Sequence, residues 1–379
     1  MKVLIEARSL SASMGVKTYI VNLLRELQRQ PAHQYTVVYD HAKHAGTNSA
    51  MQEVVVPLHT PLQTSWWLQY QIPGVINREQ PAVAHFTKAD VPRRKKVPTV
   101  VTIHDVIPLF LPSSQKLLQR LYWPQAMARS AKYSDHILTM SEVSKQDIIK
   151  YLQVSPDKIT VAPLAADTQH FHPVAAPTVQ AVTQKHGIQS PYILFVGTWE
   201  PRKNIPALLR AFAAQKNNIP HQLVLAGKKG WKYEAAVAVL QELRLGDRVR
   251  VLDYVPYEDL PALYTGADLF VWPSVYEGWG LPVLEALACG VPVITSDGGS
   301  LPQVVGSAGV VVSFAVSDVA ARLEDDTFTR LLGEAIGRVA NDTARKQTLR
   351  AAGPQQATTF SWAQVAEKTV QVYEQVVRL

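Results

Sequence analysis

The chain has 379 residues, which is long for one hydrophobic core and fits two domains of roughly 150–200 residues each. Hydrophobic residues make up 47% of it and charged residues 18%, which is ordinary for a globular protein, and no apolar run reaches the length of a membrane span. The formal net charge of +7 lies in one half: residues 1–170 carry 19 Lys and Arg against 12 Asp and Glu, whereas residues 171–379 carry 19 of each.

The single cysteine, Cys289, excludes an internal disulfide and fits a reducing compartment. The N-terminal sequence MKVLIEARSL enters a strand directly and lacks the shape of a signal peptide. We therefore expect a cytoplasmic protein.

The excess positive charge of the first half forms two clusters, Arg93–Lys96 and the stretch from Lys116 to Lys132. Such asymmetry indicates an anionic partner, but no nucleic-acid-binding motif accompanies it, so nucleic acid is not expected. An anionic membrane surface on the inner face of the cell membrane, or a lipid diphosphate acceptor, explains the pattern. The alternative is a solvated basic surface that aids solubility, and the sequence leaves both open.

The first half reads as a doubly wound α/β domain. Lys2–Ala7 is predicted to be a strand, followed by a loop over Ser9–Thr18 that contains Gly15, and by an amphipathic helix over residues 19–30. A helix over 65–79, interrupted by Pro73, carries an aromatic group that is either core or a lipid-facing surface. Further strands are predicted at residues 35–39, 51–56, 82–86, 97–103, 135–140 and 158–162.

His104 and Asp105 directly follow the apolar strand 97–103. Ligands of open α/β sheets bind beyond the carboxyl ends of the strands, so this position favours a functional histidine over a structural one. The segment after it, residues 112–132, has apolar side chains on one side and basic ones on others. It is either a membrane-surface helix or a domain helix with a solvated basic side.

The prolines between Phe171 and Thr178 indicate a linker. We predict one domain over residues 1–170, a second domain over 178–358, and a C-terminal helical segment over 360–379. The second domain begins with a strand at 192–196 and a basic loop containing Arg202 and Lys203 at a helix start, a pattern suited to a diphosphate. By the same logic Lys228, after the strand 223–226, is a phosphate or base contact.

Residues 271–299, VWPSVYEGWGLPVLEALACGVPVITSDGG, read as strand, loop, helix and strand. Gly278 and Gly280 let the backbone approach a ligand closely, and Pro282 fits the first turn of the helix. Glu277 precedes the helix and Glu285 lies inside it. Backbone N–H groups at the helix start suit phosphate, and the carboxylates suit sugar hydroxyls. The alternative is an ordinary turn with two solvated glutamates.

This unit resembles the E-x7-E signature of retaining GT-B glycosyltransferases, most closely glycosyltransferase family 4, the glycosyl transferases group 1. The segment TIHDVIPLFLP resembles the His-Asp segment of that family, and residues 197–204 its second nucleotide-sugar motif. The resemblance implies two Rossmann-like domains facing a cleft, the first binding the acceptor and the second binding the donor, with a C-terminal helix that crosses back to the first domain.

The family's roles carry over residue by residue. The resemblance places His104, with Asp105, at the donor sugar, Glu277 at the same sugar, and Glu285 at the ribose. The backbone of Gly278, Trp279, Gly280 and Leu281 would hold sugar and phosphate, and Lys203 the leaving diphosphate.

Two departures weaken parts of the match. Relatives often have arginine directly after the glycine where this chain has Thr198, so Arg202 is the residue left to supply that charge. The glycine-rich first loop is reduced to Gly15, which puts its phosphate contact in doubt.

The resemblance implies transfer of a hexose with retention, and the expected donor is GDP-mannose. The expected acceptor is a glycan or lipid-linked glycan in the synthesis of a surface polysaccharide or lipopolysaccharide. No Asp-x-Asp motif and no His/Cys cluster is present, so no metal and no cofactor is expected. Two alternatives remain: a phosphorylase or synthase with a soluble sugar or phosphate acceptor, and a non-catalytic sugar-nucleotide-binding subunit.

Overall fold

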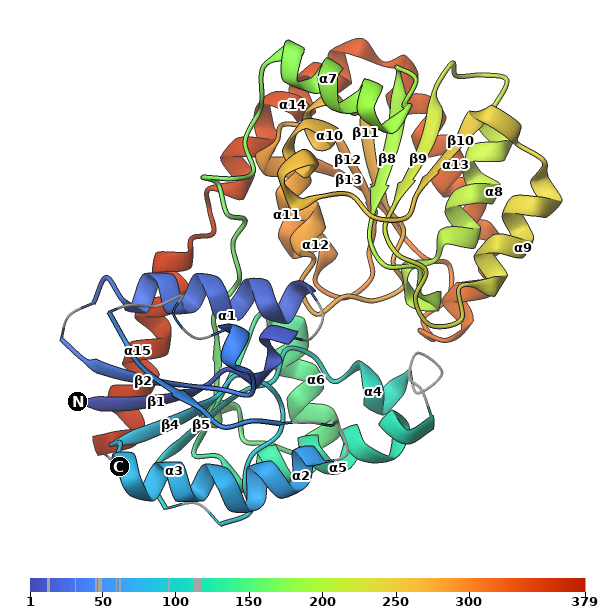
Figure 1. Ribbon diagram of the computed structural model, residues 1–379. Helices are drawn as coiled ribbons and strands as arrows, with labels where there is room; N and C mark the ends of the chain where they lie inside the picture. Colours follow the sequence, from blue (N-terminus) through green and yellow to red (C-terminus); the bar gives the residue numbers. More distant parts are fainter. Residues whose placement is uncertain are drawn as a thin grey trace. The chain divides into compact units, whose positions relative to one another are not determined.

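The computed structural model describes residues 1–11, 14–30, 32–44, 46, 50–58, 60, 63–94, 96–111 and 117–378. The chain forms two compact units, each built on a parallel sheet with helices on both faces (Figure 1). The first unit takes in Met1–Phe110, Leu117–Leu164 and Ser361–Leu379, and the second takes in Ala165–Phe360. Lys95 and Lys116, which the sequence assigned to basic clusters, lie outside the described residues.

The sheet of the first unit has the strand order β3-β2-β1-β4-β5-β6-β7, with every pair parallel. The inner strands Val83–Phe86, Thr99–Thr102 and His136–Thr139 are buried along their whole length, as expected for a parallel sheet between helices. Their bounds are β1 Lys2–Glu6, β2 Gln34–Tyr39, β3 Gln52–Val55, β4 Val83–Phe86, β5 Thr99–Thr102, β6 His136–Thr139 and β7 Ile159–Val161.

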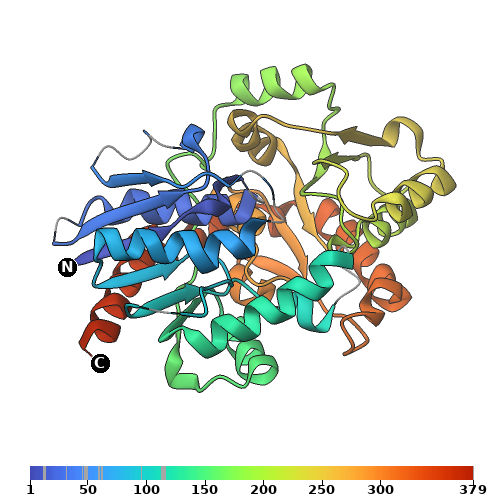
Figure 2. The same ribbon diagram turned by 60° about the horizontal axis from the view of Figure 1, so that its bottom comes forward.

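One face of this sheet packs against helices that include α3 (Ile72–Glu79), α5 (Leu117–Tyr133) and α6 (Glu142–Leu152), around Phe86, Val101 and Ile137. Figure 2 shows α3 and α5 crossing in front of the sheet. Ser141 caps α6 by accepting a hydrogen bond from the Ser144 amide at 3.0 Å.

The other face packs against α1 (Met14–Leu27) and the C-terminal helix α15 (Trp362–Arg378). Buried residues of α15 recur at helical spacing, among them Trp362, Val365, Thr369 and Tyr373. The Tyr373 hydroxyl lies 2.6 Å from Nδ1 of His85 on β4, and both side chains are buried. The predicted return of the C-terminal helix to the first domain is therefore confirmed.

Two expected helices begin elsewhere. The helix predicted over residues 19–30 begins at Met14, so Gly15 lies in the first turn of α1 rather than in a loop. The segment predicted to be a linker up to Thr178 is helical from Ala176, because Pro177 fits the first turn of α7 (Ala176–His186).

The helix predicted over 65–79 is divided into α2 (Thr64–Trp66), a π-helical turn over Trp67–Gln71, and α3. Pro73 lies in the first turn of α3, at the predicted interruption. Of the aromatic group, Trp67 is fully buried and belongs to the core, while Trp66 and Tyr70 are exposed; contact of these two with lipid stays a prediction.

The sheet of the second unit has the order β10-β9-β8-β11-β12-β13, again all parallel. Its strands are β8 Tyr192–Val196, β9 Gln222–Ala226, β10 Val249–Leu252, β11 Leu269–Trp272, β12 Val293–Ser296 and β13 Gly309–Val312. Its other helices are α8 Ile205–Gln215, α9 Glu234–Leu243, α10 Leu260–Gly266, α11 Leu281–Ala288, α12 Leu301–Val305, α13 Asp326–Asn341 and α14 Thr343–Ala357.

Helices α8, α9 and α13 cover one face of this sheet, and α10, α11 and α12 cover the other (Figure 1). The predicted doubly wound architecture is thus confirmed for both units. None of the helices in the described part of the chain is both long and apolar enough to cross a membrane.

Candidate functional site

The sequence motifs of the second unit meet at a topological switch point. Strand β8 lies between β9 and β11, so the connections that leave β8 and β11 run to opposite sides of the sheet. Open α/β sheets bind ligands beyond the carboxyl ends of the strands at such a point. The loop after β8 contains Arg202 and Lys203, and the loop after β11 contains Glu277.

Glu277 joins these two loops. Its Oε1 accepts a hydrogen bond from Nζ of Lys203 and its Oε2 accepts one from Nη1 of Arg202, each at 2.6 Å. Burial favours the neutral carboxyl, but the charges of Arg202 and Lys203 outweigh it and lower the pKa of Glu277 to about 2. The carboxylate is therefore ionised at neutral pH and holds both cations in place.

Lys203 is itself buried, with Nζ 4.3 Å from the ring centroid of Trp272 at the end of β11. Burial and the neighbouring Arg202 lower the pKa of Lys203 to about 8, although Glu277 acts in the opposite direction. Arg202 also pairs with Glu200 at 3.2 Å. The result is a compact group of two cations around one buried carboxylate.

A third loop, which includes Gly299 and Ser300 and was not predicted to belong to the site, contacts the backbone of Glu277. The amide of Ser300 donates to the Glu277 carbonyl at 3.1 Å, and Gly299 pairs with Glu277 as an isolated bridge. A Cβ on Gly299 would lie 2.2 Å from that carbonyl oxygen, and its φ of +67° favours glycine. The signal available in the sequence was the pair Gly298-Gly299 directly after a buried strand.

The loop from Gly278 to Leu281 leads into α11. Gly280 has a φ of +127°, and a Cβ there would lie 2.9 Å from Leu301. The indole of Trp279 is buried edge-on against Phe360, and the Trp279 carbonyl accepts from the Ser300 hydroxyl at 2.6 Å. Both contacts hold the backbone of the predicted sugar- and phosphate-binding loop.

Glu285 lies one turn into α11 and accepts a hydrogen bond from the Tyr264 hydroxyl at 3.0 Å. Burial raises the pKa of Glu285 to about 7, and the bond from Tyr264 only partly offsets it. Unlike Glu277, this carboxylate has no cationic partner that the structure describes. The two glutamates therefore differ in charge state near neutral pH.

Lys228 follows β9 and is exposed, with Nζ 5.0 Å from the ring centroid of Tyr254. Its loop is anchored to the loop after β8, because the Trp199 amide donates to the Lys228 carbonyl at 2.9 Å. Gly227 allows this approach: its φ is +142°, and a Cβ there would lie 2.1 Å from the Gly197 carbonyl oxygen.

The remaining predicted residues belong to the first unit. Nε2 of His104 donates to the Thr87 carbonyl at 3.0 Å, and the Tyr19 ring contacts the imidazole edge-on. Burial lowers the pKa of His104 to about 4, so the imidazole is neutral at pH 7. Asp105 accepts a hydrogen bond from the Ile107 amide at 3.1 Å, at the start of α4 (Ile107–Phe110). Gly15, in the first turn of α1, is exposed.

The sequence analysis missed a buried charge cluster at the switch point of the first sheet, between β1 and β4. Asp90 accepts hydrogen bonds from Arg129 and from the Tyr122 hydroxyl, and Arg8 lies 3.7 Å from Asp90 and 3.6 Å from Glu6. These residues are far apart in the sequence, and the one local signal is the Glu6-Ala-Arg8 ending of the first strand.

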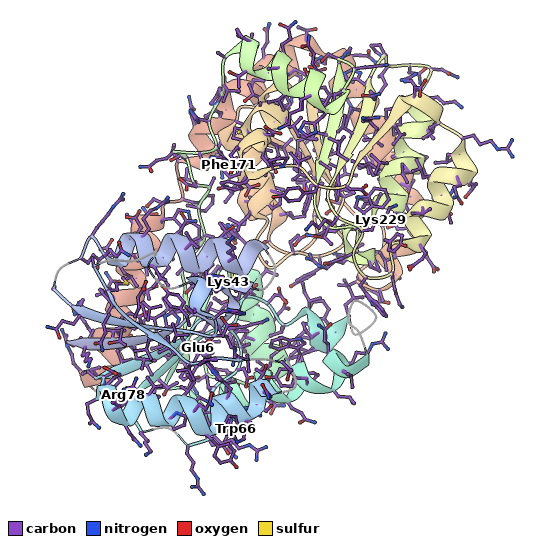
Figure 3. All side chains as sticks on the ribbon, viewed as in Figure 1. Glu6, Lys43, Trp66, Arg78, Phe171 and Lys229 are labelled. Atoms are coloured by element: carbon purple, nitrogen blue, oxygen red, sulfur yellow. The ribbon has the colours of Figure 1, made fainter. Side chains whose placement is uncertain are left out.

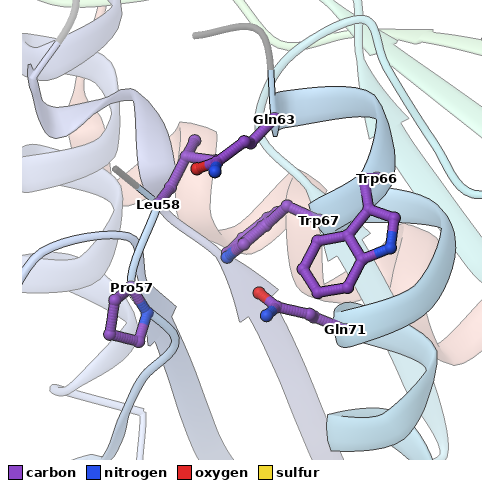
Figure 4. A pocket seen from close by; sticks show the side chains of 6 residues that line it. All are labelled: Pro57, Leu58, Gln63, Trp66, Trp67 and Gln71. Carbon is purple, nitrogen blue, oxygen red and sulfur yellow. The ribbon is translucent and has the colours of Figure 1, made fainter. Parts of the chain in front are cut away.

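A separate pocket of about 200 Å³ lies where the chain leaves β3. Pro57 and Leu58 form one wall of it, and the other is formed by α2 and the π-helical turn (Figure 4). None of the residues predicted for the donor site lines it. No group of three His, Cys, Asp or Glu side chains among the described residues is placed to hold a metal ion.

Comparison with known proteins identifies the family. Residues 180–326 match the family described as glycosyl transferases group 1, and residues 14–170 match glycosyltransferase family 4. The chain is 34% identical over 283 residues to O-antigen chain mannosyltransferase B of Escherichia coli, an alignment that covers 73% of this chain and 70% of that enzyme.

Solved structures show the same fold. Sucrose-phosphate synthase from Thermosynechococcus elongatus superposes with a TM-score of 0.77 at 19% identity, covering 99% of each chain. HepE from Anabaena, solved in complex with UDP-glucose, superposes with a TM-score of 0.75 at 16% identity, covering 99% of this chain and 100% of that one. The chain is therefore a GT-B glycosyltransferase, a hexosyltransferase that belongs to family 4.

Proposed function

We propose that the second unit binds a nucleotide-diphosphate sugar, with GDP-mannose as the donor. The arrangement of Arg202, Lys203 and Glu277 at the β8/β11 switch point carries this proposal, because it sets two fixed cations beside the start of α11. The relative from Escherichia coli is named a mannosyltransferase, which supports mannose as the sugar.

Each residue has a distinct task in this proposal. Arg202, Lys203 and exposed Lys228 attract the diphosphate, and the backbone from Gly278 to Leu281 holds sugar and phosphate. Glu285 accepts hydrogen bonds from the ribose, and Glu277 orients the two cations and meets the sugar hydroxyls. The family resemblance assigns His104 to the donor sugar; its imidazole is neutral, and Asp105 fixes the backbone that follows it.

The chemistry proposed is transfer with retention. The acceptor hydroxyl oxygen bonds to the anomeric carbon on the face from which the diphosphate leaves, and the bond from carbon to phosphate oxygen breaks. The acceptor proton passes to the departing phosphate oxygen. Arg202 and Lys203 stabilise the negative charge that develops there, without a metal ion.

The acceptor proposed is a glycan or lipid-linked glycan of a surface polysaccharide, held by the first unit. The name of the Escherichia coli relative, an O-antigen chain enzyme, supports this class. A peripheral position on the inner face of the membrane fits the net positive charge of residues 1–170 and the exposed side chains of Leu118 and Leu121.

The test is a panel of GDP-mannose, UDP-glucose, UDP-N-acetylglucosamine, GDP-fucose and dTDP-rhamnose, measured for binding and slow hydrolysis. The wild type is compared with Glu285→Ala and with Glu242→Ala, a control glutamate on α9 whose side chain is 59% exposed. We expect GDP-mannose alone to bind tightly and to lose affinity only in Glu285→Ala. Binding without any turnover would support a non-catalytic subunit, and transfer to free sugar or phosphate would support a synthase or phosphorylase.

A further inference from the structure

The pocket beside β3 has the chemistry of a carbohydrate subsite. Its lining residues are Pro57, Leu58, Gln63, Trp66, Trp67 and Gln71. None of these six is charged, two carry indole rings and two carry primary amides. Sugars present an apolar C–H face that stacks on aromatic rings, and hydroxyls that pair with amides, which both donate and accept.

The aromatic part of the pocket is exposed. The Trp66 side chain is 54% exposed and projects outward from the first unit (Figure 3), and Tyr70, 69% exposed, lies beside it with ring centroids 6.3 Å apart. Trp67, in contrast, is fully buried and is held by a hydrogen bond from its Nε1 to the Val56 carbonyl at 2.8 Å. The pocket therefore has the fixed indole of Trp67 at its base and the exposed indole of Trp66 at its rim, an arrangement that suits an extended ligand.

The polar part of the pocket has an unused acceptor. Oε1 of Gln71 is buried and accepts no hydrogen bond from the residues that the structure describes. A buried amide oxygen without a donor costs about 1–3 kcal/mol, so a ligand hydroxyl that reached it would recover a hydrogen bond. Among the described residues, Oε1 of Gln63 accepts only one hydrogen bond, a long one of 3.3 Å from the backbone N–H of Thr60.

The local backbone is unusual at the same place. Trp67–Gln71 form a π-helical turn between α2 and α3, and such turns are frequent at functional sites. The turn changes the angular spacing of side chains; it directly follows Trp66 at the rim of the pocket and ends with Gln71 in its wall (Figure 4).

The pocket lies at the carboxyl edge of the sheet, where ligands of open α/β sheets bind. It follows β3, and His104 follows β5, so both are at the carboxyl ends of parallel strands. Four strand spacings separate β3 from β5 in the order β3-β2-β1-β4-β5, which corresponds to about 19 Å at 4.8 Å per strand. An acceptor chain several sugars long spans such a distance.

We infer that this pocket is a secondary binding site for a neutral segment of the acceptor glycan, remote from the sugar that receives the hexose. The inference rests on the proposed function, since it names part of the acceptor of the same reaction. Trp66 stacks on a sugar ring, and Gln71 accepts a hydrogen bond from a sugar hydroxyl. The site would favour long acceptors over short ones.

The experiment measures binding of α-manno- and α-gluco-oligosaccharides of increasing length by calorimetry with the full chain, without donor. The variants are Trp66→Ala and Gln71→Leu, and the control is Leu121→Ala, a residue of α5 that is 65% exposed. We expect affinity to rise with oligosaccharide length in the wild type and in the control. Both pocket variants should lose about tenfold for long oligosaccharides and bind short ones as the wild type does.

A second arm measures binding to vesicles that contain anionic lipid. If Trp66→Ala reduces vesicle binding and neither variant changes oligosaccharide binding, the surface meets lipid and the inference is wrong. Absence of saturable oligosaccharide binding by the wild type overturns it as well. Donor hydrolysis reports separately on the proposed function, because oligosaccharide binding requires no turnover and Trp66 takes no part in the donor site.

Discussion

The hydroxyl of Tyr264 donates a hydrogen bond to Oε2 of Glu285 at 3.0 Å. The buried Glu285 carboxylate is thus paired with a neutral donor. With no cation to stabilise the charged form, burial raises the pKa of Glu285 to about 7. The same helix start thus carries a glutamate that is half protonated near neutral pH, a few residues from Glu277, which is fully ionised.

The contribution of Glu285 to the stability of the protein should therefore fall as pH rises from about 4.5 to about 7. In this window the folded state retains a proton on Glu285 that the unfolded state has released, so the free energy of unfolding decreases, by at most about 3 kcal/mol. Glu285→Gln should remove this contribution, so the difference in the free energy of unfolding between wild type and variant, measured in urea at several pH values, should change across this window. A difference that stays constant would show that another group controls the pH dependence.

Affinity for the nucleotide sugar should change in the opposite direction. The ionised carboxylate is the stronger acceptor for ribose hydroxyls, so binding by the wild type should tighten between pH 6 and 7, below the pKa of about 8 at which Lys203 loses its charge. The diphosphate of a nucleotide sugar does not titrate in this range, and Glu285→Gln should bind with little pH dependence. Equal pH profiles for the two proteins would argue against contact between Glu285 and the ribose.

Lys203 and Glu277 should be strongly coupled in stability. Glu277→Gln leaves the buried Lys203 without its carboxylate, and Lys203→Met leaves Glu277 with Arg202 alone, so each should cost about 3 kcal/mol. The double variant should cost clearly less than the sum, because it removes both charges. Urea unfolding of the four proteins measures the coupling, and additive losses would contradict it.

Gly299→Ala should displace the loop that holds Glu277. The added Cβ would lie 2.2 Å from the Glu277 carbonyl oxygen, on a backbone with a φ of +67°. The matched control is Gly246→Ala, at a φ of +53° with nothing within 4 Å, which should cost only about 1 kcal/mol for backbone strain. We expect the first variant to lose more stability and at least tenfold in donor affinity, measured by calorimetry. Similar behaviour of the two would show that the close approach has no role.

Tyr373→Phe should weaken the attachment of α15 to the first sheet. It leaves Nδ1 of the buried His85 without its partner, at a cost of about 1–3 kcal/mol. Tyr151→Phe, on a half-exposed ring of α6, is the control and should be nearly neutral. Hydrogen exchange should show faster opening of residues 362–378 in the first variant only. Unaltered exchange there would mean that apolar packing alone holds the helix.

Local patterns were enough to predict much of the fold. Pro282 after Gly280 marks the start of a helix, and His104 after an apolar run marks the end of a strand, because helix starts and strand ends depend on contiguous residues. The first helix was placed five residues late because the small residues before Gly15 suggested a loop. The end of the linker was misplaced because Pro177 can also begin a helix.

The sequence by itself determined that the chain has two doubly wound domains, and which residue types follow the strands at the carboxyl edge of each sheet. Tertiary structure alone decided what those residues do to one another. Glu277 meets Lys203 across 74 residues, His85 meets Tyr373 across 288, and Gly299 lies against the Glu277 carbonyl. Ion pairing, desolvation and close backbone approach depend on distance and burial in space, and spacing along the chain does not specify them.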